Sequence, residues 1–428
     1  MVTMKKAITA CLATVMLLGC SSCGSSSMNF GKKISLNIQA PEKLLKKGGW
    51  IQTMEDAFSQ ENPGVSFKNT PIKQFNDPNS SSGNKRSSKI TADVFLFQSD
   101  RTGDLVKSKI LGELSEKSEE QIKKQNPLPL LNSVLEVNKY YGVPYTSDAW
   151  FMYYDKSKLS KDDVKSLNTI LEKQKVAINL RNNTLLSSFY FDSCITFLHS
   201  NPGMNNTNGA SFNENCTSIT KFLKVLSNQP NFINAVEDTG INALKDGSAA
   251  AYFSGIWDAE EVKKILGKNF AAAPLPKVRT DMINDSEEYV GEPVEYQMKQ
   301  NVYSQAIGYN ADSEHRDLAE KFAVFLGSTQ SQKKAYELQK IVPSDKSLKS
   351  FVAKDPATSA QMQTVEKASI TQPLSDNELY TISYTFYHLG DSLYRKSTDE
   401  SIYEMTENIQ DNMNNQLLKQ SKRNSNDQ

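Results

Sequence analysis

The chain has 428 residues, with 49 basic side chains, 49 acidic side chains and only three histidines. This balance of charge gives no support for a nucleic-acid partner, because such proteins present a basic surface that neutralises phosphates. The histidines are widely spaced and none belongs to an HExxH pattern, which disfavours a zinc site and a Ser-His-Asp hydrolase. The chain also lacks a nucleophile-elbow motif, a P-loop and a strand-linked GxGxxG. We therefore expect no metal, no cofactor and no catalytic residue.

The N-terminal residues are typical of a secretory signal. Two lysines precede an apolar run over 7–18, which is too short to remain as a spanning helix. The run ends in Leu-Leu-Gly directly before Cys20, which resembles a bacterial lipobox, where the cysteine is lipidated and becomes the mature N-terminus. We expect residues 1–19 to be a signal peptide, Cys20 to carry the lipid (palmitate), and 20–29 to be a flexible tether. The alternative is an ordinary signal peptide with an incidental cysteine.

The rest of the chain is too long for one core. About 400 residues predict two lobes or domains, since single cores stop growing below that size. No other stretch approaches the ~20 apolar residues needed to cross a bilayer. Cys194 and Cys216 remain in this part. An exported chain could join them, but two free buried thiols are an open alternative.

The first half of the chain alternates strands and helices. Residues 34–40 alternate apolar and polar side chains, which predicts a strand, and a second strand is expected over 65–67. Between them, apolar residues at helical spacing from Trp50 predict a helix that ends at Asn62-Pro63-Gly64. A buried strand over 94–97 follows, with a short helix beginning near Asp104. This order indicates an α/β lobe with a mostly parallel sheet.

The second half of the chain is also expected to contain both strands and helices. An apolar strand over 147–155 holds one acid, Asp148, near its start, and another strand is expected over 249–253. A helix is expected over 258–266. Ser313 is expected to cap a later helix whose apolar positions follow the helical period. From Asn377 the chain is expected to be helical and to end in a polar, disordered tail.

Polar and aromatic residues follow two of the buried strands. Asp100 and Arg101 come directly after 94–97, and Trp257 lies in the turn after 249–253. In open α/β sheets, ligands lie outside the carboxyl ends of the strands. A carboxylate and a guanidinium together satisfy sugar hydroxyls, which both donate and accept, while an aromatic ring packs on the C–H face of a sugar. Asp148 lies at the start of its strand, where the chain could cross between lobes.

Several stretches occur in an order that is similar to one known family. They are Ser99–Val106 with Leu111–Leu114, Tyr141–Tyr145 leading to Asp148, Asp246–Asp258 ending in Pro274-Leu275-Pro276, and Leu318–Gly327 with Ile341–Ser344. Together they resemble the extracytoplasmic solute-binding proteins of ABC importers, in the maltose/maltodextrin-binding group found among Gram-positive lipoproteins. The resemblance runs through most of the mature chain.

The resemblance implies an α/β periplasmic-binding-protein type II fold, with two lobes, a hinge and an interlobe ligand cleft. By this analogy one lobe takes residues 30–146 and 277–342. The other takes residues 147–276 and 343–428. The ligand would be held between the two lobes.

The resemblance also assigns residues to the ligand. Asp100 and Arg101 would bind sugar hydroxyls from the first lobe. Asp148 stands where the family has a ligand-binding glutamate, and Trp257 matches a stacking tryptophan of the second lobe. The alternatives for these residues are a surface ion pair or helix cap at 100–101, a hinge hydrogen bond for Asp148, and core packing for Trp257.

Other positions depart from the family pattern. Phe97 occupies the place of a tryptophan beside the Asp-Arg pair, and Tyr380 is what remains of a late Tyr-Trp platform. Packing is the alternative for both. A Glu-x-Tyr contact of the family is replaced by Asn182-Asn183-Thr184, which loses the carboxylate and the ring.

These observations predict a monomeric binding protein and not an enzyme. It would be lipid-anchored on the extracytoplasmic face of a bacterial membrane, bind an oligosaccharide such as a maltodextrin, and deliver it to ABC permease subunits. A binding protein for another solute, such as a different glycan or a peptide, is one alternative. A secreted glycosidase is the other, and it would need two carboxylates about 5–9 Å apart across one cleft.

Overall fold

The computed structural model describes residues 33–73, 90–197, 210–284, 286–371, 376–396 and 400–426. The expected signal peptide, Cys20 and the expected tether lie outside these residues. In the described part of the chain, no helix combines the length and the apolar character that crossing a membrane requires.

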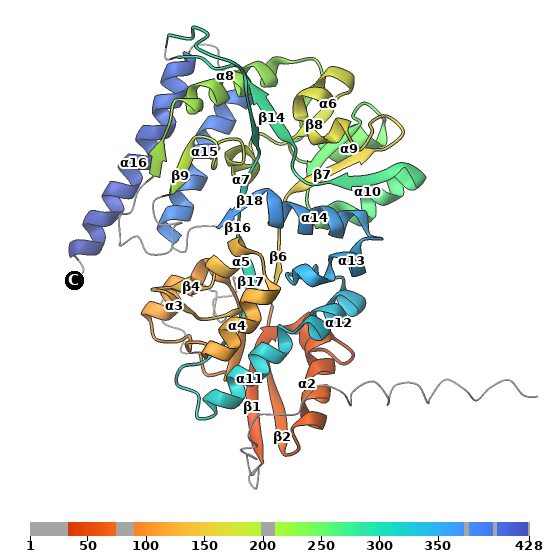
Figure 1. Ribbon diagram of the computed structural model, residues 1–428, viewed down its shortest axis with the longest axis vertical. Helices are drawn as coiled ribbons and strands as arrows, with labels where there is room; N and C mark the ends of the chain where they lie inside the picture. Colours follow the sequence, from red (N-terminus) through yellow and green to blue (C-terminus); the bar gives the residue numbers. More distant parts are fainter. Residues whose placement is uncertain are drawn as a thin grey trace, which may run out of the picture.

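Two five-stranded sheets form two lobes, arranged one above the other along the long axis of the molecule (Figure 1). The first sheet has the order β2-β1-β3-β17-β6, with bounds β1 Ile34–Pro41, β2 Val65–Ile72, β3 Val94–Gln98, β6 Val143–Ser147 and β17 Ser304–Tyr309. Strands β1, β2 and β3 are parallel, and β17 runs antiparallel to both β3 and β6. This confirms the mostly parallel sheet and the strands expected near 34, 65 and 94.

Helices enclose the first sheet. They are α1 Glu42–Leu45, α2 Trp50–Glu61, α3 Thr102–Lys107, α4 Glu116–Gln125, α5 Leu128–Asn132, α11 Arg316–Leu326 and α12 Thr329–Gln339. The apolar face of α2 and the apolar face of α11 share one core with β1 and β3. Phe58 and Phe322 meet there edge to face, with ring centroids 5.0 Å apart. The small β4 Leu135–Glu136 and β5 Lys139–Tyr140 form a hairpin beside α3.

The second sheet has the order β11-β8-β12-β7-β13, with bounds β7 Phe151–Asp155, β8 Val176–Ile178, β11 Phe232–Asn234, β12 Ala251–Ser254 and β13 Phe270–Ala273. Its largest core includes residues of α6 Leu167–Lys173, α7 Asn183–Ser187, α8 Asn215–Asn228, α15 Asp376–Arg395 and α16 Ile402–Asn426. A second core includes residues of α9 Thr239–Lys245, α10 Ala259–Leu266 and α14 Pro356–Lys367. The two cores share no residue.

Three segments cross between the lobes. The first joins β6 to β7 through residues 148–150, and the second joins β16 Gln300–Val302 to β17. The third runs from α12 through α13 Lys349–Val352 to α14. β16 pairs with β18 Ser369–Thr371, just after α14.

Residues just after 277 pack with the second sheet. The hairpin of β14 Lys277–Thr280 and β15 Val294–Gln297 belongs with the second sheet, because Val278 and Met298 are buried in its core. We therefore propose that the second crossing lies within residues 299–303.

Asp148 lies between two strands and not inside one. The sequence predicts a single strand over 147–155, but β6 ends at Ser147 and β7 begins at Phe151. The physical reason is the side chain of Gln300. Its amide accepts a hydrogen bond from the Trp150 N–H at 2.8 Å and donates one to the Trp150 carbonyl at 2.7 Å. A side chain thus takes the place of a strand partner at this residue.

Two other expectations about helix ends are wrong. Ser313 does not cap α11, which begins at Arg316 with no side-chain cap. The Ser313 hydroxyl instead donates to the Asp93 carboxylate at 2.6 Å and accepts from the His315 N–H, because the turn before α11 is held against the first sheet. At the C-terminus, α16 continues to Asn426, where the sequence predicts a disordered tail.

Cys194 and Cys216 form a disulfide, with Cα atoms 5.2 Å apart. Both cysteines are buried, so the bond lies in the core of the second lobe. It ties the residue before β9 Ile195–Phe197 to the first turn of α8. β9 pairs with β10 Ala210–Phe212. The disulfide is therefore the correct choice between the two alternatives that the sequence left open.

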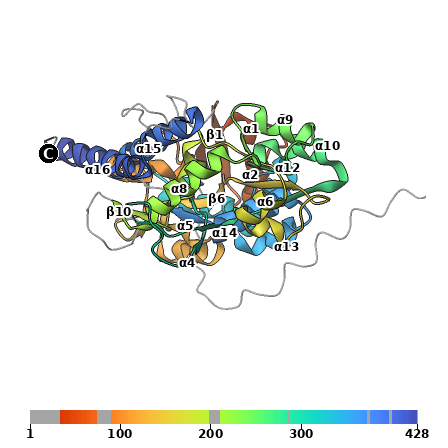
Figure 2. The same ribbon diagram turned by 90° about the horizontal axis from the view of Figure 1, so that it is seen from above.

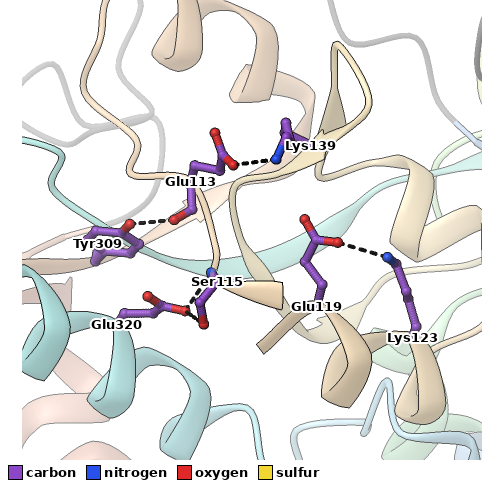
Figure 3. Close-up of polar contacts among 7 residues, drawn as sticks. All are labelled: Glu113, Ser115, Glu119, Lys123, Lys139, Tyr309 and Glu320. Carbon is purple, nitrogen blue, oxygen red and sulfur yellow. Dashed lines mark hydrogen bonds and ion pairs between the residues drawn. The ribbon is translucent and has the colours of Figure 1, made fainter. Parts of the chain in front are cut away.

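A polar network fastens the segment after α3 to the first lobe (Figure 3). One carboxylate oxygen of Glu320, on α11, accepts hydrogen bonds from the Ser115 N–H at 2.8 Å and the Ser115 hydroxyl at 2.6 Å. Tyr309, at the end of β17, donates to the backbone carbonyl of Glu113, whose side chain pairs with Lys139 at 2.7 Å. The chain that leaves the Asp100-Arg101 turn is thereby fixed to both a helix and a strand.

Candidate functional site

Asp100 and Arg101 lie at the carboxyl end of the central strand β3, as the sequence predicts. Residues 94–97 are fully buried, and a 3-10 turn over Ser99–Arg101 leads into α3. Ser99 is also fully buried, and its hydroxyl accepts a hydrogen bond from the Ser304 N–H at 2.9 Å. Arg101 is largely buried and lies 3.5 Å from the Asp104 carboxylate. The turn is therefore held against β17 while both charged side chains remain partly accessible.

Tyr303 connects the two acids that the sequence singles out. It lies in the crossing that leads into β17, and burial together with the negative charges of Asp148 and Asp100 raises the pKa of its phenol well above the ordinary value. Both acids therefore act electrostatically on the same tyrosine. The Tyr303 oxygen is also 3.5 Å from the Gln98 side-chain amide.

Asp148 is held by a short chain of polar groups. The Gln305 amide donates to its carboxylate at 3.4 Å, and the Gln305 oxygen accepts from the Tyr145 hydroxyl at 2.9 Å. Burial raises the pKa of Asp148, while the Gln305 hydrogen bond and the charge of Lys43 act in the opposite direction. The carboxylate is therefore oriented from the first lobe although it lies on the crossing segment.

Trp257 lies in the turn after β12 and is 54 % exposed. The turn is rigid, because the Asp258 carboxylate accepts from the Tyr252 hydroxyl at 3.0 Å and from the Ser254 hydroxyl. Gly255 leaves room for the Trp257 ring in this position, since a Cβ there would lie 2.2 Å from it. Trp257 is therefore not a core residue, and its exposed ring is accessible to a ligand.

Trp150 stands against Trp257, with ring centroids 5.2 Å apart and planes at 80°. The sequence predicts only packing for Trp150, either inside its strand or beside the hinge. The structure bears out packing beside the hinge, because Trp150 lies on the crossing segment and packs against the core of the second lobe, and it adds the contact with Trp257.

Phe97 and Tyr380 have contrasting environments. Phe97 is fully buried in an apolar cluster with Phe95, Leu105 and Val134. This burial favours packing as its role, so we do not propose Phe97 as a ligand contact. Tyr380 is 59 % exposed on α15. Its ring lies against that of Tyr384, with centroids 6.1 Å apart.

Asn182 has a structural role in place of the missing Glu-x-Tyr contact. Its side chain caps α7 by accepting a hydrogen bond from the Leu185 N–H at 2.9 Å. This cap explains why asparagine suits the position.

Sequence reasoning did not find Tyr303, Gln305 or the role of Trp150. The signal that was available is the stretch Tyr303-Ser304-Gln305, which places polar groups at the entry of the otherwise apolar strand β17. Gln305 lies opposite Gln98 in the β17–β3 register, and this places its amide next to the end of β3.

The assembled groups suit a neutral, polyhydroxylated ligand. Carboxylates accept, Arg101 and Gln305 donate, and the Trp150–Trp257 pair offers apolar area. In the described ranges, no group of three or more His, Cys, Asp or Glu residues could hold a metal ion.

Comparison with known proteins identifies relatives along most of the chain. Residues 53–363 match the family model described as bacterial extracellular solute-binding protein. A galactooligosaccharide-binding protein of Bacillus subtilis (strain 168) is 24 % identical over 319 residues, which cover 68 % of this chain and 69 % of that protein.

Solved structures show the same two-lobed fold. A chain solved with acarbose is 30 % identical with a TM-score of 0.64, covering 89 % of this chain and 99 % of the other. The maltodextrin binding protein MalE1 from L. casei BL23, solved without ligand, is 22 % identical with a TM-score of 0.71 and covers 88 % of this chain and 99 % of its own. A cyclo/maltodextrin-binding protein complexed with maltotetraose is 13 % identical with a TM-score of 0.67, covering 91 % and 98 %.

Proposed function

The chain belongs to the bacterial extracellular solute-binding protein family, and from this membership we propose that it binds an oligosaccharide between its lobes and delivers it to an ABC permease. The observation that carries the proposal is the placement of Asp100 and Arg101 at the carboxyl end of the buried strand β3, next to the segment that holds Tyr303 and Gln305, whose amide binds Asp148. Trp257 would supply the apolar face from the second lobe. Asp100, Asp148 and Trp257 come from three separate segments of the chain.

We propose a maltodextrin-like ligand. The relatives solved with acarbose and with maltotetraose support this choice. The galactooligosaccharide-binding relative supports a second candidate, a galactose-containing oligosaccharide in the same site. Both ligands are neutral chains of sugar rings, so the same donors, acceptors and aromatic surface would serve either one.

Binding would be coupled to closure of the lobes. A sugar can favour the closed state only if it interacts with that state more strongly than with the open one. Asp100 and Arg101 on the first lobe, with Trp257 on the second, would provide this difference by contacting one ligand together. The closed form would then dock on the permease as a monomer.

The proposed location is the extracytoplasmic face of the membrane, with a lipid on Cys20. This part of the proposal rests on the sequence of the first residues, since they lie outside the described part. Mass spectrometry of protein extracted from membranes should show a diacylglyceryl-type modification on an N-terminal peptide that begins at Cys20. A Cys20→Ala variant that remains in the membrane fraction would contradict the anchor.

Titration calorimetry of the mature protein tests the ligand class. We expect maltotriose to bind with a 1:1 stoichiometry and to raise the melting temperature, and galactooligosaccharides serve as the second arm. If only the galactose series binds, the second candidate replaces the first. If neither binds, the solute is of another class. Release of shorter sugars during incubation would instead support a glycosidase.

A further inference from the structure

The exposed face of α15 carries a row of aromatic side chains that the proposed site does not use. Tyr380 and Tyr387 are 59 % and 50 % exposed, and Tyr384 and His388 lie between and beside them. We call these four residues the α15 aromatic strip. They occupy positions i, i+4, i+7 and i+8, which lie on one side of a helix.

The strip faces outward because the opposite side of α15 is fixed. Ile382, Phe386, Leu389 and Leu393 are buried in the core of the second lobe. Gly390 lets the helix approach the segment after β8 closely, since a Cβ there would lie 2.3 Å from the Leu180 carbonyl oxygen. α15 and α16 lie together at one side of the molecule, opposite α10 (Figure 2). The exposure of the strip is therefore a property of the folded helix.

The four rings form a continuous surface. The Tyr380 and Tyr384 rings are nearly parallel, with centroids 6.1 Å apart, and Tyr384 meets His388 edge to face at 4.4 Å. Tyr387 also meets His388, at 5.7 Å. Among the residues that the structure describes, no hydrogen-bond partner occurs for the three phenols, so these groups are available to a ligand.

The strip is free of charged side chains and has a charged boundary. Residues 380–390 contain no Asp, Glu, Lys or Arg. One turn later, Asp391 pairs with Arg181 at 3.3 Å and with Arg395 at 2.7 Å, and Arg181 lies over the Tyr394 ring. The aromatic surface that remains free thus ends at His388.

We propose that the α15 aromatic strip is a second carbohydrate-binding surface, which holds the part of a long linear oligosaccharide that extends past Tyr380. The inference rests on the proposed function for the class of ligand. Eight residues of helix rise about 12 Å, which exceeds the length of one sugar ring. Exposed ring area packs on sugar C–H groups, and the phenols can both donate to and accept from hydroxyls.

A protein partner suits the strip less well. A fully buried Phe, Tyr or Trp side chain contributes about 150–250 Å², so the half-exposed Tyr380 and Tyr387, with the less exposed Tyr384 and the smaller His388, offer at most roughly 500 Å². A stable protein interface buries about 800 Å² on each partner. Continuity with Tyr380, already a candidate ligand contact, favours a neutral glycan that runs along the helix.

The test compares ligands of two lengths in the mature protein. The triple variant Tyr384→Ala/Tyr387→Ala/His388→Ala removes three of the four strip residues and keeps Tyr380. Tyr289→Ala is the matched control, because Tyr289 is a 71 % exposed tyrosine outside α15. Calorimetry should show a Kd for maltoheptaose at least fivefold higher in the triple variant, with the Kd for maltotriose within twofold of wild type. If the triple variant and the wild type bind maltoheptaose with equal affinity, the strip does not bind the sugar, and the proposed function of the cleft is unaffected.

Affinity electrophoresis through gels that contain soluble starch or galactan covers the case in which no short sugar binds. Retardation of the wild type and of Tyr289→Ala, lost in the triple variant, would support the strip even if the proposed cleft function failed. Equal mobility of all three proteins in both gels would overturn it.

Discussion

Trp150 and Trp257 meet edge to face, with ring centroids 5.2 Å apart. The first lies on the segment that crosses from β6 to β7, and the second lies in the turn after β12. Such aromatic pairs contribute about 0.5–1.5 kcal/mol beyond their buried area. The crossing segment that carries Asp148 is therefore in direct contact, through Trp150, with the turn that presents Trp257.

Replacing Trp257 should weaken sugar binding with little effect on folding. In Trp257→Ala we expect binding to be weaker by about 1.5–3 kcal/mol, which is the free energy gained by burying one large apolar side chain. The melting temperature should change little because half of the side chain is already exposed. Calorimetry and thermal unfolding measure the two effects. A large loss of stability together with unchanged affinity would assign Trp257 to packing.

Arg101 and Asp104 allow ligand binding to be separated from a surface ion pair. Arg101→Ala should weaken binding by roughly 2 kcal/mol or more, since a buried hydroxyl of the sugar would lose its partner. Asp104→Ala removes the other half of the 3.5 Å ion pair and is the matched control. Its affinity should remain within about fivefold of wild type, because ion pairs near the surface contribute only about 0–1 kcal/mol. Equal losses of affinity in Arg101→Ala and Asp104→Ala would mean that binding depends on the ion pair and not on a contact between Arg101 and the sugar.

Sugar binding should depend on the ionisation of Asp148. Because burial raises its pKa, the carboxylate takes up a proton at a higher pH than an ordinary aspartate does. Only the ionised form makes the stronger, charge-assisted hydrogen bond with a hydroxyl. Affinity should therefore fall as the pH is lowered through this raised pKa, whereas Asp148→Asn should bind more weakly at neutral pH and show a flatter profile. If the affinities of the wild type and of Asp148→Asn change with pH in the same way, Asp148 is not the group whose ionisation controls binding.

The raised pKa of Asp148 also affects the stability of the ligand-free protein, but with the opposite dependence on pH from sugar binding. A folded-state pKa above the unfolded value means that the native state binds the proton more tightly. The contribution of Asp148 to the free energy of unfolding is thus full at low pH and is lost as the pH rises through the native pKa. In the ligand-free protein, Asp148→Asn should reduce this dependence, which denaturant unfolding at several pH values would measure.

Removing the disulfide should affect stability and not ligand affinity. Cys194 and Cys216 are 22 residues apart, and closing a loop of this size stabilises a fold by about 3 kcal/mol. The double variant Cys194→Ser/Cys216→Ser should lose roughly this amount in denaturant unfolding, and a reductant should no longer shift its midpoint. A ligand affinity reduced more than about twofold at a temperature where the variant is folded would show that the bond also shapes the site.

Local sequence patterns were enough to place the candidate site at strand ends. The four apolar residues before Asp100-Arg101, and those before the Trp257 turn, mark buried strands whether or not their partners are known. The chain length predicted two lobes for a similar reason, because one core cannot grow to this size.

Other features depended on residues far apart in the sequence. Asp148 was expected inside a strand, but Gln300, 150 residues away, takes the backbone hydrogen bonds of Trp150 and ends that strand. Gln305 reaches Asp148 across 157 residues. The sequence offers no local pattern that pairs such residues.

The sequence by itself determined the lobes, the sheet type and the strand ends that carry Asp100, Arg101 and Trp257, because burial and periodicity are local properties of the chain. Only the tertiary structure decided that Tyr303 lies near both Asp100 and Asp148, that Phe97 is core, and that Trp150 stands against Trp257. These relations follow from the register of β17 against β3 and from the paths of the crossing segments, which bring distant residues into contact.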